Sequence, residues 1–163
     1  MFSGRYEGRN IATGDLDAAA WAIQLETCKF SSENLKRMED SACPGSGACA
    51  LLGTANTMQC LSEAVGMALP YSGTAPAASA KRLWLARESG RQIVSLIREG
   101  IRPMDILTKE ALENMVRVLH AIGGSTNAVL HILALGQELD LLDEINLETF
   151  DKLSRETPCI SNV

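Results

Sequence analysis

The chain has 163 residues, of which 46% are hydrophobic, and this content favours a folded domain over intrinsic disorder. Its 20 acidic and 15 basic residues give a formal charge of -5, so it has no basic excess with which to bind a nucleic-acid backbone. Its apolar runs are far shorter than the roughly 20 residues that cross a bilayer, and it opens with no signal-peptide pattern. These features favour one compact cytoplasmic domain without membrane or nucleic-acid partners.

The first half of the chain predicts helices around an unusual loop. A polar segment with several glycines comes first, and residues 15–25 are consistent with a short helix. The next helix is predicted to begin at Ser31 or Ser32, which can cap it, and to end before Pro44. Residues 42–53 then have the composition of a loop, because their glycines permit positive φ.

This loop leads into a helix that begins near Thr54 or Asn56 and ends at Leu69-Pro70. A long helix is expected over residues 79–99 and is closed by Gly100. Its apolar stripe, at steps of three and four residues, comprises Leu83, Ala86, Gly90, Val94 and Ile97.

Three further helices are predicted from their capping residues. Thr108, Ser125 and Asn146 each precede an apolar residue pattern of helical period. One or two short strands are expected, around Leu69 or over residues 158–163. This part of the chain is therefore predicted to be mainly helical.

Five cysteines at irregular spacings match neither a secreted disulfide framework nor a C-x-x-C zinc pair. Cys43 and Cys49 lie in the glycine-rich loop that opens onto a helix N-terminus, where the helix dipole favours thiolate, the form that binds a soft metal. From spacing alone, the alternative is that Cys49 and Cys60 are small buried hydrophobic residues. A structural zinc site made by Cys43, Cys49 and Cys60 is disfavoured by their spacing.

Two long sequence blocks carry a resemblance to a known family. The first runs from Gly47 to Met58 (GACALLGTANTM) and continues through residues 61–70. The second comprises residues 101–111 (IRPMDILTKEA) and residues 121–131 (AIGGSTNAVLH). Both blocks closely resemble the dihydroxy-acid dehydratase and 6-phosphogluconate dehydratase family, in the same order and at the expected distance.

The resemblance implies a hydro-lyase that removes water from a 2,3-dihydroxy carboxylic acid to give a 2-keto acid. In that family an iron–sulfur cluster of [2Fe–2S] or [4Fe–4S] type, held by three cysteines, acts as a Lewis acid on the departing hydroxyl. Mg²⁺ holds the substrate carboxylate. Homo-oligomers, dimers or tetramers, are usual in the family, so we expect the same here.

Carried over residue by residue, Cys49 matches a cluster cysteine of the family, because three residues separate it from the GTANTM motif. Cys43 lies in a Cys-Pro-Gly stretch seen in many members and is a weaker candidate ligand. Ser125 and Thr126, in the Gly-Gly-Ser-Thr-Asn motif, are weak candidates for substrate binding at a helix N-terminus. The alternative for them is an ordinary helix cap.

The chain departs from the family pattern because it contains no Cys-Asp-Lys motif, which supplies further cluster and magnesium ligands. The serine that the family uses as base lies in a later domain. Residues 1–163 therefore resemble a partial N-terminal, cluster-binding domain, an interior fragment without the C-terminal domain and inactive alone. The implied parent fold is α/β, with a parallel sheet flanked by helices, whereas this fragment is predominantly helical and would expose apolar helix faces.

Two further features of the sequence concern the substrate and the class of function. The terminal residues 157–163 (TPCISNV) resemble sugar-acid dehydratases more than the branched-chain biosynthetic type, which favours aldonic acids over 2,3-dihydroxy-isovalerate. The functional alternative to an enzyme is a non-catalytic helical module of the same fold that binds a partner and holds no cluster.

Overall fold

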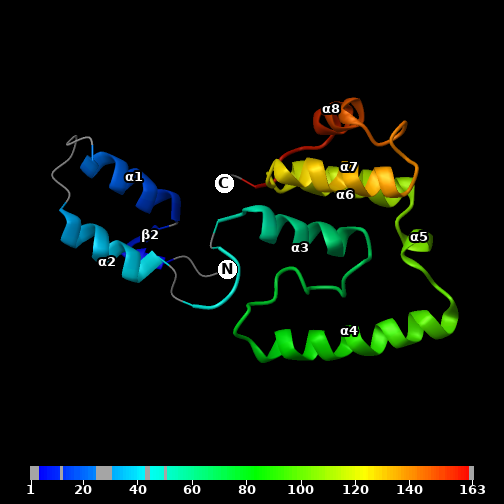
Figure 1. Cartoon of the computed structure of the whole chain (residues 1–163), viewed down its shortest axis with the longest axis horizontal. Coiled ribbons are helices and arrows are strands. Elements are labelled where there is room, and N and C mark those ends of the chain that lie inside the picture. Colours follow the sequence, from blue (N-terminus) through cyan, green and yellow to red (C-terminus); the bar gives the residue numbers. More distant parts are fainter. Residues whose placement is uncertain (1–3, 12, 25–30, 43–44, 50, 162–163) are drawn as a thin grey trace. The chain divides into compact units, whose positions relative to one another are not determined.

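The computed structural model describes all residues except 1–3, 12, 25–30, 43–44, 50 and 162–163 (Figure 1). The described residues are mostly helical, which confirms the expectation for this fragment. They form two compact units, one comprising Met1–Leu51 with Pro76–Ala78 and the other comprising Leu52–Ala75 with Ser79–Val163. The chain thus has two units where its length and composition favour one domain.

The first unit contains a hairpin that was not predicted. Strands β1 (Gly4–Tyr6) and β2 (Arg9–Ile11) pair antiparallel, with Tyr6 opposite Arg9. Glu7 and Gly8, at φ of 48° and 81°, form the two-residue turn. Sequence reasoning missed the hairpin because its strands are short and polar, and because glutamate rarely adopts a positive φ.

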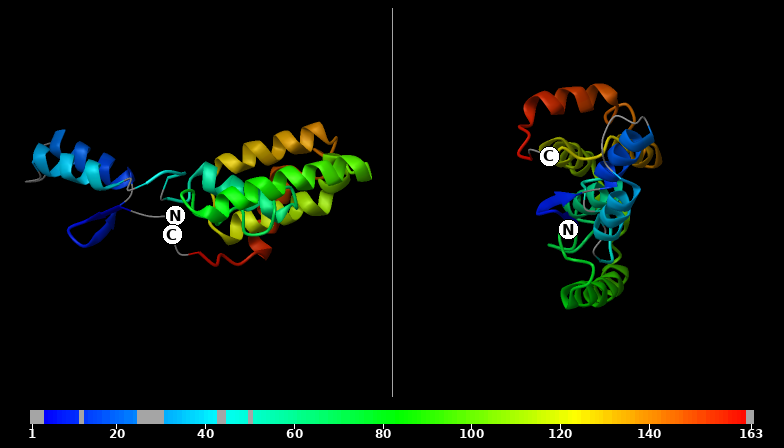
Figure 2. Two further views of the ribbon diagram at one scale, coloured as in Figure 1. Left: turned by 90° about the horizontal axis from the view of Figure 1, so that it is seen from below. Right: turned by 90° about the vertical axis from the view of Figure 1, so that its left-hand side faces the viewer.

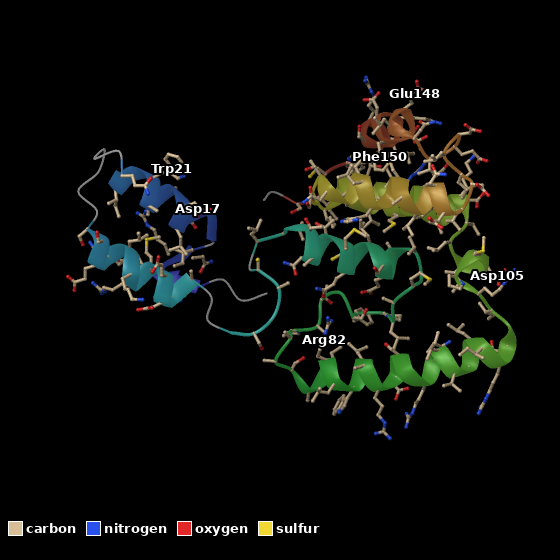
Figure 3. The ribbon with its side chains drawn as sticks, viewed as in Figure 1. Asp17, Trp21, Arg82, Asp105, Glu148 and Phe150 are labelled. Carbon is tan, nitrogen blue, oxygen red and sulfur yellow. The ribbon has the colours of Figure 1, made fainter. Side chains whose placement is uncertain are left out.

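Two helices cover this hairpin, and both were predicted. They are α1 (Thr13–Gln24) and α2 (Ser32–Ala42). Asp17 and Trp21 of α1 are shown in Figure 3, and Trp21 is exposed. The small core of the unit consists of Ile11, Met38 and Ala42, with Tyr6, Leu16 and Ala19 packed against it.

The second unit is built around helix α6 (Lys109–Ala121). Helices α3 (Thr54–Ala64), α7 (Asn127–Glu138) and α8 (Leu147–Glu156) each pack against it, as the views in Figures 1 and 2 show. The apolar periodicity of α6 predicts this packing, since four of its side chains are buried. The buried core comprises Leu61, Val65, Leu107, Leu112, Met115, Val116, Leu119, Ala128, Ile132, Ile145, Phe150 and Leu153.

The predicted caps of three helices are confirmed. The Thr108 hydroxyl accepts the Ala111 N–H at 3.3 Å, and the Asn146 side chain accepts the N–H groups of two residues in the first turn of α8. Gly100 ends α4 (Ala80–Glu99) in the left-handed conformation, at φ 72°. These caps fix where α4, α6 and α8 begin or end.

Several expectations need correction. Helix α3 ends at Ala64, before the predicted Leu69-Pro70, and a short helix α5 (Pro103–Ile106) was not predicted. Leu147, the first residue of the apolar pattern that follows Asn146, is 65% exposed and does not join the buried side of α8. Within the described residues, neither the segment around Leu69 nor residues 158–161 form a strand, because both lie in loops without a neighbouring edge.

Helix α4 differs most from its prediction, because none of its 20 residues is buried. The stripe that the sequence places on one face includes Leu83, Val94 and Ile97, which are 74%, 45% and 72% exposed. The expectation that apolar helix faces would be exposed is met here. The β1–β2 pair is the one sheet among the described residues, so the parallel sheet of the implied parent fold stays an expectation. No helix in this part of the chain is long and apolar enough to span a bilayer.

Candidate functional site

The two sequence motifs meet where α3 and α7 begin. The Ser125 hydroxyl lies 3.1 Å from the Thr54 hydroxyl, and the Ser125 N–H donates to the Thr57 hydroxyl at 3.0 Å. The Asn127 side-chain N–H donates to the Thr54 hydroxyl at 2.9 Å. We call these four residues the Thr–Ser junction. It joins segments about 70 residues apart in the sequence, so it depends on the packing of α3, α6 and α7.

Thr57 anchors the junction from within the core, since its side chain is fully buried. A buried polar group needs a hydrogen-bond partner, and the Ser125 N–H supplies it. The sequence marks Ser125 as a residue of interest but gives no sign that Thr57 receives its N–H.

The Gly-Gly pair of the second motif is explained by close packing. Gly123 follows α6 with φ 60°, a left-handed conformation that ends the helix. A Cβ added to Gly124 would lie 2.8 Å from both the Leu119 Cδ1 and the Thr57 Cγ2 atoms. Gly124 therefore lets the α6–α7 turn approach α3 closely enough for the junction bonds to form.

The junction places two helix N-termini side by side. Gly53, the N-cap residue of α3, has no side chain with which to cap the helix, and the Thr126 side chain makes no capping bond at the start of α7. Ser125 was predicted to cap this helix, whereas Thr126 is its N-cap residue. The Ser125 hydroxyl nevertheless accepts the N–H of Asn127, the first residue of α7, at 3.3 Å. Thr126 and Asn127 are exposed, and Ser125 is half-buried. Helix N-termini carry partial positive charge, so this arrangement suits a carboxylate or another anion.

We expect a Thr57→Val substitution to weaken the junction without changing its shape, because valine has the same outline but cannot accept the Ser125 N–H. One half-buried N–H would then lack its protein partner, and we expect a loss toward the lower end of the roughly 1–3 kcal/mol that an unpaired buried donor costs. The midpoint of urea unfolding measures this loss. The matched control is Thr74→Val, since Thr74 is exposed and its hydroxyl donates to the Tyr71 carbonyl at a long 3.5 Å. An equal shift for both variants would contradict the assignment.

Cys49 lies in the loop before α3, and its side chain is exposed. It precedes Gly53 along the chain, so the glycine-rich loop does lead to a helix N-terminus, as predicted. The expectation from spacing alone that Cys49 is a buried hydrophobic residue is wrong. An exposed thiol of this kind is accessible to a metal centre.

The described residues do not form a complete metal site. They contain no group of three or more His, Cys, Asp or Glu side chains that could hold a metal ion. Cys43, the weaker candidate ligand, lies outside the described residues. The described part of the chain could therefore contribute one ligand to an iron–sulfur cluster, the thiolate of Cys49. The remaining ligands would come from elsewhere.

Cys60 has a different environment, since it is half-buried on α3. Burial, and to a lesser degree the nearby charge of Glu63, raises the pKa of its thiol. A raised pKa leaves less thiolate at any pH below it, which disfavours metal binding and fits the prediction that Cys60 belongs to the packing.

We therefore expect Cys60 to react with iodoacetamide more slowly than the exposed Cys159 at pH 8, because the thiolate is the nucleophile. Its rate should keep rising with pH after that of an ordinary thiol has levelled off. Peptide mass spectrometry over a pH series measures both rates, and unfolding in urea should make them equal. Faster reaction at Cys60 in the folded protein would contradict its burial.

The two histidines, His120 and His131, lie on helices α6 and α7. His120 is half-buried on α6 and packs edge-on against Phe150, with ring centroids 6.4 Å apart. His131 is exposed on α7. Neither residue lies among the hydrogen bonds of the Thr–Ser junction.

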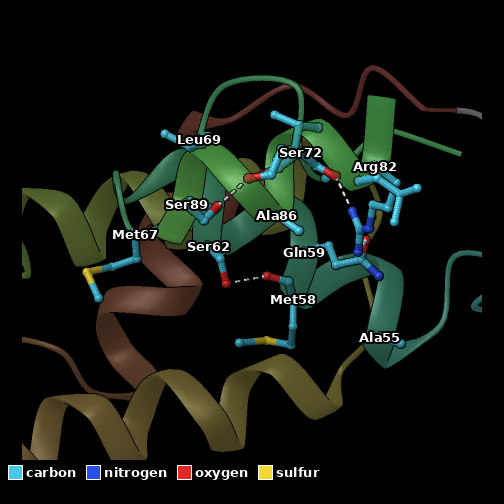
Figure 4. A pocket seen from close by; sticks show the side chains of 14 residues that line it. Ala55, Met58, Gln59, Ser62, Met67, Leu69, Ser72, Arg82, Ala86 and Ser89 are labelled. Atoms are coloured by element: carbon cyan, nitrogen blue, oxygen red, sulfur yellow. Dashed lines mark hydrogen bonds between the residues drawn. The ribbon is translucent and has the colours of Figure 1, made fainter. Parts of the chain in front are cut away.

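A groove of about 540 Å³ lies between α3, the loop after it and α4 (Figure 4). Arg82 lies at one end, where its guanidinium donates to the Ser72 carbonyl at 2.6 Å and to the Gln59 side chain at 3.4 Å. The Glu63 carboxylate accepts the N–H groups of Tyr71 and Gly73, which holds the loop in place. These bonds attach α4 to α3 through polar contacts, so the guanidinium serves a structural role.

Comparison with known proteins gives one consistent result. A family model described as "Dihydroxy-acid/6-phosphogluconate dehydratase N-terminal" matches residues 3–163. A dihydroxy-acid dehydratase of Moorella thermoacetica is 45% identical over 160 residues, which are 98% of this chain and 28% of the relative. Dihydroxy-acid dehydratases of Pyrococcus abyssi and Metallosphaera sedula are 43% and 46% identical over 100% and 98% of the chain. The chain spans 29% and 28% of the length of these two relatives.

Proposed function

Because this chain belongs to the dihydroxy-acid/6-phosphogluconate dehydratase family, we propose that it forms part of a hydro-lyase that converts a 2,3-dihydroxy carboxylic acid into a 2-keto acid. The observation that best supports the proposal is the contact between the two family motifs. Thr54 and Ser125, one from each motif, are held 3.1 Å apart where two helices begin. Both motifs carry the family resemblance, and both lie at this one place in the structure. Their contact therefore supports a single substrate site to which both contribute.

Within this enzyme, the Thr–Ser junction holds the anionic end of the substrate. A carboxylate placed against the starts of α3 and α7 is stabilised by their partial positive charge, and the hydroxyls of Ser125 and Thr126 can donate to it. The junction would thereby orient the diol without itself transferring a proton. The support is the geometry of these helix starts, which lack a capping side chain at Gly53 and Thr126.

Cys49 is proposed to supply one thiolate to an iron–sulfur cluster. When bound, such a cluster supplies a Lewis acid for a departing hydroxide, and Mg²⁺ neutralises the substrate carboxylate. The exposed thiol in a glycine-rich loop supports this role for Cys49, with Cys43 as a weaker second candidate. Since the described residues form no complete site, the remaining ligands and the catalytic base are assigned to the rest of a longer protein, and residues 1–163 alone are proposed to be inactive.

The names of the relatives bear on the substrate. Those compared above are called dihydroxy-acid dehydratases, whereas the terminal residues of this chain led to an expectation of sugar acids. We therefore propose a 2,3-dihydroxy acid of the branched-chain type as the preferred substrate. The whole protein is proposed to work in the cytoplasm as a homo-oligomer.

An assay of the whole protein, purified without oxygen, tests this function. Each of 2,3-dihydroxy-isovalerate, a pentonate and a hexonate is offered in turn, and 2-keto acid is measured as its phenylhydrazone. We expect 2-keto acid from 2,3-dihydroxy-isovalerate at the highest kcat/KM. A preference for an aldonate would overturn the substrate assignment, while no product from a protein with a full complement of iron would favour the non-catalytic module.

A further inference from the structure

Helix α4 has two different sides. Leu85 and Leu96 are half-buried, Leu85 lines the groove beside α3, and Arg82 is bonded to the loop that follows α3 (Figure 4). Next to this side runs a stripe at helical spacing that is open to solvent, although three of its members are large aliphatic residues between 53% and 74% exposed. Its first two members, Leu83 and Ala86, also line the groove of Figure 4. We call this surface the α4 stripe; it consists of Leu83, Ala86, Gly90, Ile93, Val94 and Ile97.

An apolar stripe along a 20-residue helix is costly to leave in water, and contiguous exposed patches of this kind mark interaction surfaces. Gly90 lies at its centre, and a Cβ added there would meet nothing within 4 Å among the described residues. The missing side chain leaves a depression in the middle of the stripe, flanked by larger residues. This shape suits a side chain inserted from a partner segment.

Arginines line one edge of the stripe. Arg87, Arg91 and Arg98 surround a shallow cavity of about 530 Å³ that also includes Gly90 and Val94. Arg91 pairs with Glu88 on its own helix, whereas Arg87 and Arg98 form no ion pair with the described part of the chain. Helix α4 has five basic and two acidic side chains, in a chain with an acidic excess overall.

We propose that the α4 stripe is a docking surface for an acidic amphipathic segment of the same longer polypeptide, from the part that lies outside these 163 residues. This proposal rests on the chain being part of a longer dehydratase. It goes beyond the function proposed above, because it assigns a surface that the Thr–Ser junction and Cys49 do not use. Apolar side chains of that segment cover the stripe, and its carboxylates pair with Arg87 and Arg98.

Two observations favour an acidic segment of the same polypeptide as the partner of the α4 stripe. The relatives are more than three times as long as this chain, which spans 28–29% of them, so most of a homologous polypeptide is available to cover α4. A second copy of α4 would bring a helix of the same positive charge against the arginine edge, and like charges repel. An acidic segment has the complementary charge.

Cysteine labelling in the whole protein tests the proposal. Ile97→Cys places a thiol in the stripe, and Glu88→Cys places one on the polar side of the same helix as a matched control. Each protein is treated with N-ethylmaleimide while folded and after unfolding in urea, and the labelled peptide is quantified by mass spectrometry. Ile93→Cys serves as a second stripe position, since Ile93 is 53% exposed and the Glu88 side chain is 52% exposed in this structure.

We expect both stripe cysteines to be protected by at least about tenfold relative to Glu88→Cys, as side chains covered by folded protein are. The protection should be unchanged over about a 100-fold dilution, because an intrachain contact does not follow mass action. Charge reversal by Arg87→Glu with Arg98→Glu should raise the labelling of Ile97→Cys. Labelling equal to the control would overturn the proposal, and protection lost on dilution would assign the stripe to a second copy instead.

Discussion

Replacing Cys49 with serine in the whole protein is expected to remove both the iron–sulfur absorbance and the dehydratase activity. A serine hydroxyl is a much poorer ligand for iron than a thiolate, so the cluster would be lost or bound weakly. Iron analysis, the visible absorption spectrum and the 2-keto acid assay measure the effect. We expect a loss of several orders of magnitude in kcat, since the Lewis acid would be absent.

The matched control for this substitution is Cys159→Ser. Cys159 is also exposed, and its thiol donates to the Ser161 carbonyl at 3.0 Å, a contact that serine can preserve. Its iron content should stay unchanged. If Cys49→Ser also retained its iron and its spectrum, the assignment of Cys49 as a cluster ligand would be wrong.

A Gly124→Ala substitution is expected to have the second-largest effect, because it forces apart the two motifs of the junction. The new Cβ would lie 2.8 Å from atoms of Leu119 and Thr57, and both side chains belong to the packed interior. Overpacking of this kind costs about 1–3 kcal/mol. Because the turn would have to move away from α3, we also expect a raised KM, since Ser125 would be displaced.

The urea-unfolding midpoint and the KM measure these two effects. The control is Gly45→Ala, since a Cβ at Gly45 meets nothing within 4 Å among the described residues and its φ is not positive. That control should change stability by no more than about 0.5 kcal/mol. An unchanged midpoint and KM for Gly124→Ala would show that the close approach of the two motifs is not needed.

Local signals in the sequence predicted much of the second unit. Thr108 and Asn146 were recognised as caps because a capping bond spans two or three residues of the same segment. The buried side of α6 was predicted for a similar reason, since its period depends only on neighbouring residues. Such features need no knowledge of the tertiary structure.

Contacts between distant segments could not be predicted in this way. The bond between the Ser125 N–H and Thr57 forms because α3 and α7 both pack on α6. No local sequence pattern predicts which helices pack together. The exposure of Leu83 and Ile97 has the same origin, because periodicity identifies an apolar side but not the partner that covers it. The hairpin turn at Glu7 was missed since its backbone conformation is unusual for glutamate.

The candidate site was predicted in part. Cys49, Ser125 and Thr126 were singled out by the family motifs, and the structure brings Ser125 into the Thr–Ser junction beside Thr54 and Asn127. Thr57 was missed because its role depends on burial, which motif spacing does not reveal. The ligands that would complete a metal site with Cys49 are not among the described residues, so no pattern within them could supply the full set.

The intact mass of the native gene product shows whether these residues belong to a longer dehydratase. Mass spectrometry of the protein isolated from its own cells gives this value without any assumption about its activity. We expect a mass several times the 17.5 kDa of this chain, because the chain spans 28–29% of the length of its relatives. A native product of 17.5 kDa would contradict the account and favour a helical module without catalysis.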